Sequence, residues 1–150
     1  MVKKRYTIRM EDESKIAKGM LVNAPISTKF AREVAVAIKG MRLEAAEAYL
    51  RRVLAHEDWV PVRRYKKKVA HRKGVRGGVK SGRYMDKTVK YFLKLIQNVK
   101  ANAEAKGLDV SALRIIHVWV GKGWRRPRIH PRTRRVVRAK STHVEMVVSP

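Results

Sequence analysis

The chain has 150 residues, enough for one ordinary domain with a modest core of its own. Its 37 Lys and Arg residues against 12 Asp and Glu give a net charge of +25, so we expect a polyanionic partner to neutralise this self-repulsion. A hydrophobic fraction of 45% excludes a fully disordered tail, and the absence of Cys excludes disulfides, thiolate zinc sites and thiol catalysis. No apolar run approaches the ~20 residues of a membrane span, and the basic start lacks the apolar segment of a secretory signal.

The first part of the chain predicts an edge strand followed by two helices. Residues 1–15 have little apolar periodicity and are expected to form an extended or loose arm, whereas the apolar segment 18–23 is a candidate edge strand. Apolar residues at near-helical spacing predict a helix over 27–40, with an N-cap serine at its first position and Phe30 in its apolar face. The same spacing predicts a second helix over 43–55.

The remaining elements are a loop, a third helix and two strands. Residues 62–84 lack periodicity and contain four glycines, so they predict a long loop of the kind that is usually functional or disordered. An apolar stripe predicts a helix over 86–106, with its first carboxylate as N-cap and Leu93 in the stripe. Residues 113–120 and 142–148 predict strands. The basic segment 121–140 between them predicts a projecting β-hairpin arm without a core of its own.

The sequence gives no indication of catalysis or of metal binding. Residues 56–58 (His-Glu-Asp) form the only dense polar cluster outside the basic segments, and we expect them to end a helix. The five histidines lack paired ligand spacing, and His117 and His143 are expected to form a cross-strand pair without a third ligand. Residues 74–78 resemble a phosphate loop only superficially, because the GxxxxGK[ST] pattern is absent. We therefore expect no enzyme, no metal and no cofactor.

Two stretches of the chain contain no carboxylate and hold 20 of its 37 basic residues. Because a solvated helix face usually mixes both signs of charge, such blocks indicate a surface built against phosphate rather than a merely soluble one. The first stretch contains Arg63, Arg64, Lys66, Lys67, Lys68, Arg72, Lys73, Arg76, Lys80 and Arg83. The second stretch contains Arg114, Lys122, Arg125, Arg126, Arg128, Arg132, Arg134, Arg135, Arg138 and Lys140.

The residue types in these stretches favour nucleic acid as the partner. Arginine dominates the second stretch, and its planar fork both binds phosphate and stacks on bases. Tyr65, Tyr84, Trp119 and Trp124 lie beside or among the basic residues, where an aromatic ring can stack on an unpaired base. We expect Trp119 in the core of the sheet, whereas for Trp124 the core and the base-stacking roles both stay open. Further candidate phosphate contacts, at the start of the first helix, are Ser27, Thr28 and Lys29.

Five segments, in this order, resemble one family. They are ISTKFAREVAVAIKGM in the first helix, VPVRRYKKK and GRYMDKTVKYFLKLIQNVKANAE in the middle, then NAEAKGLDVSALRIIHVWV and THVEMVV. Over residues 18–148 the chain resembles the archaeal and eukaryotic members of the ribosomal large-subunit protein L twenty-two family (L seventeen in the eukaryotic naming). The chain departs from the family at Thr28, where many members have Pro, and at 131–135, where the Gly of the family's arm tip is missing.

The resemblance implies an α+β fold in which three helices pack on a small three-stranded antiparallel sheet, with a long protruding basic β-hairpin. It implies one ribosomal-protein domain, with a body over 18–120 and 141–148. The hairpin would thread through large-subunit ribosomal RNA and line the polypeptide exit tunnel with its tip, which carries over to Arg128, Ile129, His130, Pro131, Arg132, Thr133, Arg134 and Arg135.

The expected partners are therefore large-subunit ribosomal RNA, neighbouring large-subunit proteins and the nascent polypeptide at the tunnel wall, in a cytoplasmic ribosome and without a membrane. The expected role is structural, and it includes help with subunit assembly. The alternative is an architectural DNA-binding protein with a basic β-arm, which would require a dimerisation face.

Overall fold

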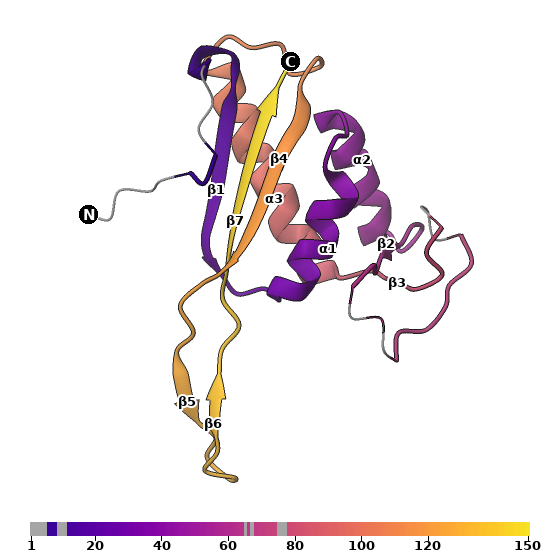
Figure 1. Cartoon of the computed structure of the whole chain (residues 1–150), viewed down its shortest axis with the longest axis vertical. Helices are drawn as coiled ribbons and strands as arrows, with labels where there is room; N and C mark the ends of the chain where they lie inside the picture. Colours follow the sequence, from indigo (N-terminus) through magenta and orange to yellow (C-terminus); the bar gives the residue numbers. More distant parts are fainter. Residues whose placement is uncertain (1–5, 9–11, 65, 67, 75–77) are drawn as a thin grey trace.

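The computed structural model of the chain describes residues 6–8, 12–64, 66, 68–74 and 78–150 (Figure 1). Its helices and antiparallel sheets confirm the α+β class predicted from the sequence. The helical elements are η1 (Glu13–Lys15, a single 3-10 turn), α1 (Thr28–Ile38), α2 (Leu43–Leu54) and α3 (Asp86–Glu104). The strands are β1 (Ala17–Ala24), β2 (Val60–Pro61), β3 (Gly82–Arg83), β4 (Arg114–Lys122), β5 (Pro127–Ile129), β6 (Val136–Arg138) and β7 (Thr142–Ser149).

The main sheet has the strand order β1-β7-β4, with both neighbours antiparallel to the central strand β7. The register pairs Ala17 with Val148 on one side and Lys122 with Thr142 on the other. A bulge between Ile115 and His117 shifts the alternation of β4. The C-terminal strand of the chain is therefore the centre of the sheet, and the strand that leads into the arm is one of its edges.

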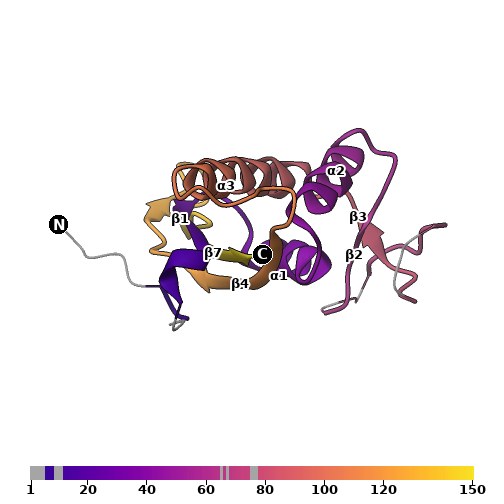
Figure 2. The same cartoon turned by 90° about the horizontal axis from the view of Figure 1, so that it is seen from above.

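Seen from above, α3 lies over one face of the main sheet and α1 lies beside its edge strand β4 (Figure 2). α3 packs on β1, α1 packs along β4, and α2 packs on α3. Gly19 makes the close approach of β1 and α3 possible, because a Cβ there would lie 2.5 Å from Cγ2 of Val99. Together with the sheet, which supplies residues such as Ile115 and Met146, the helices enclose a continuous apolar core. We call the helices and the three-stranded sheet the body.

The described N-terminal residues lie against part of the opposite face of the sheet. The backbone N–H and the hydroxyl of Thr7 both donate hydrogen bonds to the Glu145 carboxylate on β7. Burial and the negative charge of Glu145 raise the pKa of the Tyr6 phenol above its ordinary value of 10.0. Val147, on the same face, is 0% exposed. Of the predicted extended or loose arm over 1–15, residues 6–8 are therefore attached to the sheet and residues 13–15 form η1, while residues 1–5 and 9–11 lie outside the described part.

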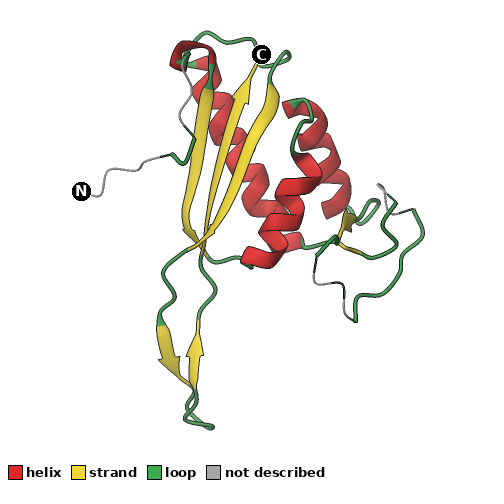
Figure 3. Cartoon of the chain, in the orientation of Figure 1, coloured by secondary structure: helices red, strands yellow, loops and turns green. Residues whose placement is uncertain are grey.

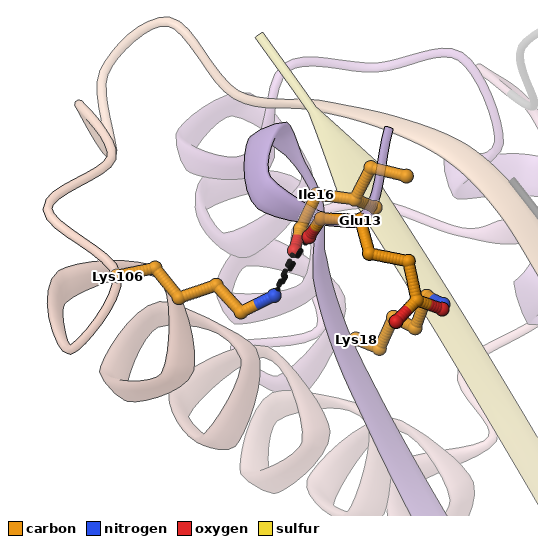
Figure 4. A network of polar contacts seen from close by, with 4 residues as sticks. All are labelled: Glu13, Ile16, Lys18 and Lys106. Carbon is orange, nitrogen blue, oxygen red and sulfur yellow. Dashed lines mark hydrogen bonds and ion pairs between the residues drawn. The ribbon is translucent and has the colours of Figure 1, made fainter. Parts of the chain in front are cut away.

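A lysine just beyond α3 holds the chain where it enters the sheet (Figure 4). The Lys106 ammonium donates hydrogen bonds of 2.9 Å to the carbonyl oxygens of Glu13 and Ile16. Lys18 forms a 2.6 Å ion pair with the Glu13 carboxylate. The hydrogen bond from Lys18 lowers the pKa of the Glu13 carboxyl. These two lysines therefore serve the fold, and their charges are engaged within the protein.

Three details of the helices differ from the sequence prediction. Phe30 is 36% exposed and lies outside the core, because it sits in the first turn of α1, beyond the edge of the sheet. Leu95 is fully buried, whereas Leu93 is only partly buried. Asp86 does not cap α3: Met85 occupies the N-cap position in a left-handed conformation (φ 56°), and the Asp86 carboxylate pairs with His56 instead.

Candidate nucleic-acid interface

The arm, residues 121–140, continues the β4–β7 pair away from the body (Figure 3). Beyond the last sheet pair, Gly123 donates a backbone hydrogen bond to Ser141, and Ala139 donates one to Arg126. β5 and β6 then pair antiparallel over three residue pairs. The side chains of residues 124–140 are all exposed, so the arm presents its charges to the solvent and has no core of its own.

One side chain of β1 holds both legs of the arm where they leave the sheet. The Asn23 side-chain oxygen accepts hydrogen bonds from the hydroxyl of Ser141 (3.1 Å) and from the backbone N–H of Trp124 (3.3 Å). Gly123 lies against the same two side chains, because a Cβ there would overlap the Ser141 hydroxyl oxygen and lie 2.7 Å from the Asn23 oxygen. The geometry at this point therefore requires the small residue.

The central loop, residues 62–84, is anchored to α1 by a buried carboxylate. Glu33 is 5% exposed and accepts hydrogen bonds from the backbone N–H groups of Arg63 (2.7 Å) and Arg64 (3.2 Å). This carboxylate fixes the backbone while leaving the side chains of both arginines exposed. Sequence periodicity did not identify Glu33, because the helix pattern treats it only as a polar residue.

The described residues of 62–84 form the predicted long loop except at Gly82–Arg83, which form β3. β3 pairs with β2, and an isolated bridge joins His71 to Ser81. A pairing of two residues is too short to produce an alternating pattern, so the sequence could not reveal it. The basic side chains of this loop are therefore carried on a partly paired scaffold.

Three parts of the sequence meet in one basic hollow of about 630 Å³. The start of α1, the central loop and the base of the arm all line it. We call this hollow the junction groove; its lining residues are Ser27, Thr28, Lys29, Phe30, Arg32, Arg64, Lys122, Arg125 and Lys140. Six of these nine residues are basic and none is acidic, so the groove is a strongly cationic concavity. Arg32 belongs to it although the sequence reading did not select that residue.

The two hydroxyl residues at the start of α1 differ in their availability. Ser27 is the N-cap residue but makes no side-chain capping hydrogen bond. The Thr142 hydroxyl donates to the Ile26 carbonyl at 2.9 Å, so Thr28, 2.9 Å from Thr142, is the donor in that pair. The Thr28 hydroxyl therefore donates its proton within the protein. Of the donors of Thr28, only the backbone N–H is left for the predicted phosphate contact.

Several ion pairs among the described residues join carboxylates to cations outside the two acid-free stretches. They join Asp12 to Lys15, Glu13 to Lys18, Glu47 to Arg51 and Lys100, Asp58 to Arg52, and Asp86 to His56. The hydrogen bond from Lys100 is the main reason that the pKa of Glu47 lies below its ordinary value of 4.5. In these pairs the carboxylates bind cations of the body that lie outside the groove and the arm.

The remaining predicted residues lie along the arm and the loop. Trp124 is 66% exposed with the Arg126 guanidinium 5.4 Å from its ring centre, which excludes the core role. The tip turns through Arg134 in a left-handed conformation, and His130 donates its backbone N–H to the Arg135 carbonyl. Exposed and apart from the groove lining are Lys66, Lys68, Arg72, Lys73, Arg83, Arg114, Arg128, Ile129, Pro131, Arg132, Thr133 and Arg138. Lys80 is exposed as well. Outside the described residues lie Tyr65, Lys67 and Arg76.

A stack of rings beside the central loop was not predicted. The Tyr84 ring stacks on His56 on one side (centroids 4.0 Å apart, planes at 12°) and on Trp59 on the other (3.9 Å, 17°). The Arg72 guanidinium lies 5.0 Å from the Trp59 ring centre. We call these four residues the aromatic column. The sequence reading treated residues 56–58 as a helix end and passed over Trp59, because the contacts depend on the β2–β3 pairing.

Neither a metal-binding cluster nor a membrane-spanning helix occurs in the described part of the chain. Its His, Asp and Glu residues form no cluster of three or more that would hold a metal ion. None of the helices in the described ranges is long and apolar enough to cross a membrane.

The Trp119 ring folds over Gly121 and is 37% exposed, so the prediction that it lies in the core is wrong.

The comparisons with known proteins agree with the resemblance read from the sequence. The chain is 47% identical over 148 residues to the large ribosomal subunit protein uL22 of Ignicoccus hospitalis, covering 94% of this chain and 92% of the relative. It is 44% identical over 148 residues to the protein of the same name from Aeropyrum pernix, covering 95% of each chain. The family model described as ribosomal protein L22p/L17e matches residues 20–149. The chain therefore belongs to the ribosomal protein L22p/L17e family.

Proposed function

We propose that the chain is a structural constituent of the large ribosomal subunit that binds large-subunit ribosomal RNA through the junction groove, the central loop and the arm. The observation that carries this proposal is the groove itself, in which six basic residues from three separate segments face one hollow without a carboxylate. Such a concavity fits the phosphate backbone of folded RNA, which presents negative charge from several directions. Family membership supports RNA over DNA as the polyanion.

A second part of the proposal concerns the arm. The exposed basic residues on both legs of the arm neutralise RNA phosphates. The tip of the arm, residues 128–135, lines the polypeptide exit tunnel and contacts the nascent polypeptide. The arm buries too little apolar surface to offset the ~1–2 kcal/mol per residue that ordering requires, so RNA supplies that ordering. We further propose that the body contacts neighbouring large-subunit proteins and that the arm aids assembly by holding separate RNA segments together.

Salt-dependent binding tests the groove. Affinity for a transcript of large-subunit ribosomal RNA is measured at several salt concentrations for the double variants Lys122→Ala/Lys140→Ala and Lys90→Ala/Lys94→Ala. The first pair is expected to lower the log–log salt slope by about 1–2 units, because each lost phosphate contact removes ~0.7 to 0.9 units. The second pair, two exposed lysines of α3 outside the groove, is the matched control and is expected to leave the slope unchanged.

Two results would contradict the proposal. Equal slopes for the two double variants would show that the groove is not the RNA site. Equal affinity for the transcript and for duplex DNA at every salt concentration would favour the DNA-binding alternative. The tunnel contact is tested separately, by placing a photo-reactive residue at position 133 and stalling translating ribosomes. A crosslink to the nascent chain is the expected result, and its absence would contradict the tunnel contact.

A further inference from the structure

The aromatic column ends in a ring whose outer face is open. His56 stacks on Tyr84 with one face, yet 52% of its side chain is exposed. At the other end of the column the Arg72 guanidinium covers Trp59, so that end is occupied. A ring that served only to close the end of α2 would stabilise the fold most if both of its faces were buried. His56 leaves one of them to the solvent.

The open ring is held rigidly by contacts from three directions. The His56 Nε2 lies 3.2 Å from the Asp86 carboxylate of α3. The Tyr84 hydroxyl donates to the His56 carbonyl at 3.1 Å, and the His56 N–H donates to the Val53 carbonyl at 3.2 Å. The backbone of His56 is left-handed (φ 62°), a conformation that is uncommon for a residue other than glycine and is found where the surroundings enforce it.

These contacts make the column a preorganised platform for a flat, electron-rich ligand. Three rings already lie nearly parallel, 3.9–4.0 Å apart between centroids, which is the arrangement in which bases stack on aromatic side chains. A fourth ring added to His56 would continue the column without any rearrangement, so little ordering entropy is lost on binding. Arg83 and Lys87 are both exposed and adjoin Tyr84 and Asp86 in the sequence, so they add positive charge to the segments that carry the column.

We infer that an unpaired RNA base stacks on the outer face of His56, so that the chain binds a single-stranded nucleotide there in addition to the phosphates of the groove. This inference rests on the proposed RNA binding and specifies a second kind of contact. Stacking is tolerant of sequence, because every base has a π-face. The site therefore selects an unstacked, accessible nucleotide rather than a particular base.

The test uses the full chain and two RNA probes of equal charge: an eight-nucleotide oligoadenylate and an abasic ribose-phosphate oligomer of the same length. In protein labelled with ¹³C-histidine, the ring protons of His56 are expected to shift upfield with the oligoadenylate and to stay in place with the abasic probe. His56→Asn removes the ring while keeping a residue type that tolerates the left-handed backbone. It is expected to weaken oligoadenylate binding about tenfold and to leave abasic binding unchanged.

His56→Phe restores a ring and is expected to return affinity towards that of the original chain, which separates stacking from the charge of histidine. If His56→Asn leaves oligoadenylate affinity unchanged, or weakens both probes equally, the stacking site is wrong. In that case salt-dependent binding of both probes would still uphold the proposed RNA binding. If neither probe binds in a salt-dependent manner, the proposed RNA binding fails and the stacking site fails with it.

Discussion

The hydroxyl groups of Thr28 and Thr142 lie 2.9 Å apart, and Thr142 in turn donates to the Ile26 carbonyl. Thr28 opens α1, and Thr142 is the residue at which the returning leg of the arm enters β7. This short chain of hydrogen bonds thus ties the helix at the junction groove to the base of the arm. Thr142 is fully buried, so its hydroxyl has no water to replace either partner.

Thr142→Val should lower the free energy of unfolding by about 1–3 kcal/mol, because it leaves the Ile26 carbonyl and the Thr28 hydroxyl without their partner. Urea unfolding measures this change. Thr133→Val makes the same chemical replacement at the exposed tip of the arm and should change stability by less than about 0.5 kcal/mol. Equal effects of the two substitutions would show that the buried pair contributes nothing specific.

Stability should fall in acid through Glu47. Its hydrogen bond from Lys100, with help from Arg51, holds the pKa of this carboxyl below 4.5 in the folded protein. A lowered folded pKa means that the stabilisation is complete above about pH 4.5 and is lost as the pH falls through the folded value. Glu47→Gln should therefore reduce the loss of stability between pH 6 and pH 3, measured by urea unfolding.

The control for this prediction is Glu44→Gln, the same replacement at an exposed position of α2 that takes part in none of the ion pairs among the described residues. It should retain the pH dependence of the original chain. If Glu47→Gln retained it as well, the link between α2 and α3 would not depend on the ionised carboxylate.

Replacing residues 124–140 by a two-residue Asn-Gly turn should leave the body folded. The removed side chains are all exposed, and hydrophobic burial in the body dominates stability. Thermal unfolding should show a cooperative transition. RNA binding should lose up to about six units of log–log salt slope, since eight cations are removed. A shortened chain that fails to fold would show that the arm belongs to the core.

Gly123→Ala should destabilise the arm base by about 1–3 kcal/mol, because its Cβ would overlap the Ser141 hydroxyl. Ser141→Ala removes that hydroxyl and should relieve part of the strain, so the double variant should be more stable than the sum of the single effects predicts. A double-mutant cycle by urea unfolding measures the coupling. Additive effects would indicate that the two residues do not press on each other.

The order and type of the main elements could be predicted from the sequence because long periodic segments report burial directly. The predicted helices 27–40, 43–55 and 86–106 differ from the observed helices by two residues or fewer at each end. The three strands of the main sheet were also placed within two residues. The attachment of Thr7 to Glu145 could not be predicted, because two hydrogen bonds leave no periodic signal in the sequence.

The candidate site was predictable in composition but not in assembly. The absence of carboxylates identified the two basic segments. The sequence alone, however, does not indicate that Lys140 and Arg64 line the same groove. Glu33 and His56 were missed for a related reason: each acts on a segment about 30 residues away, through contacts that only the fold creates. Trp59 was missed because its partner Tyr84 lies across the β2–β3 pairing.

The attachment of both arm legs at Asn23 has a consequence for the order in which RNA is engaged. Once the groove has bound, the arm is tethered, and its encounter with a second RNA segment becomes intramolecular. The rate of this second encounter then depends on the effective concentration of the arm at the second RNA segment. A short, fixed arm base raises this effective concentration far above the concentration of free protein. Loosening the base at Asn23 should therefore slow capture of the second segment even though every cation of the arm is still present.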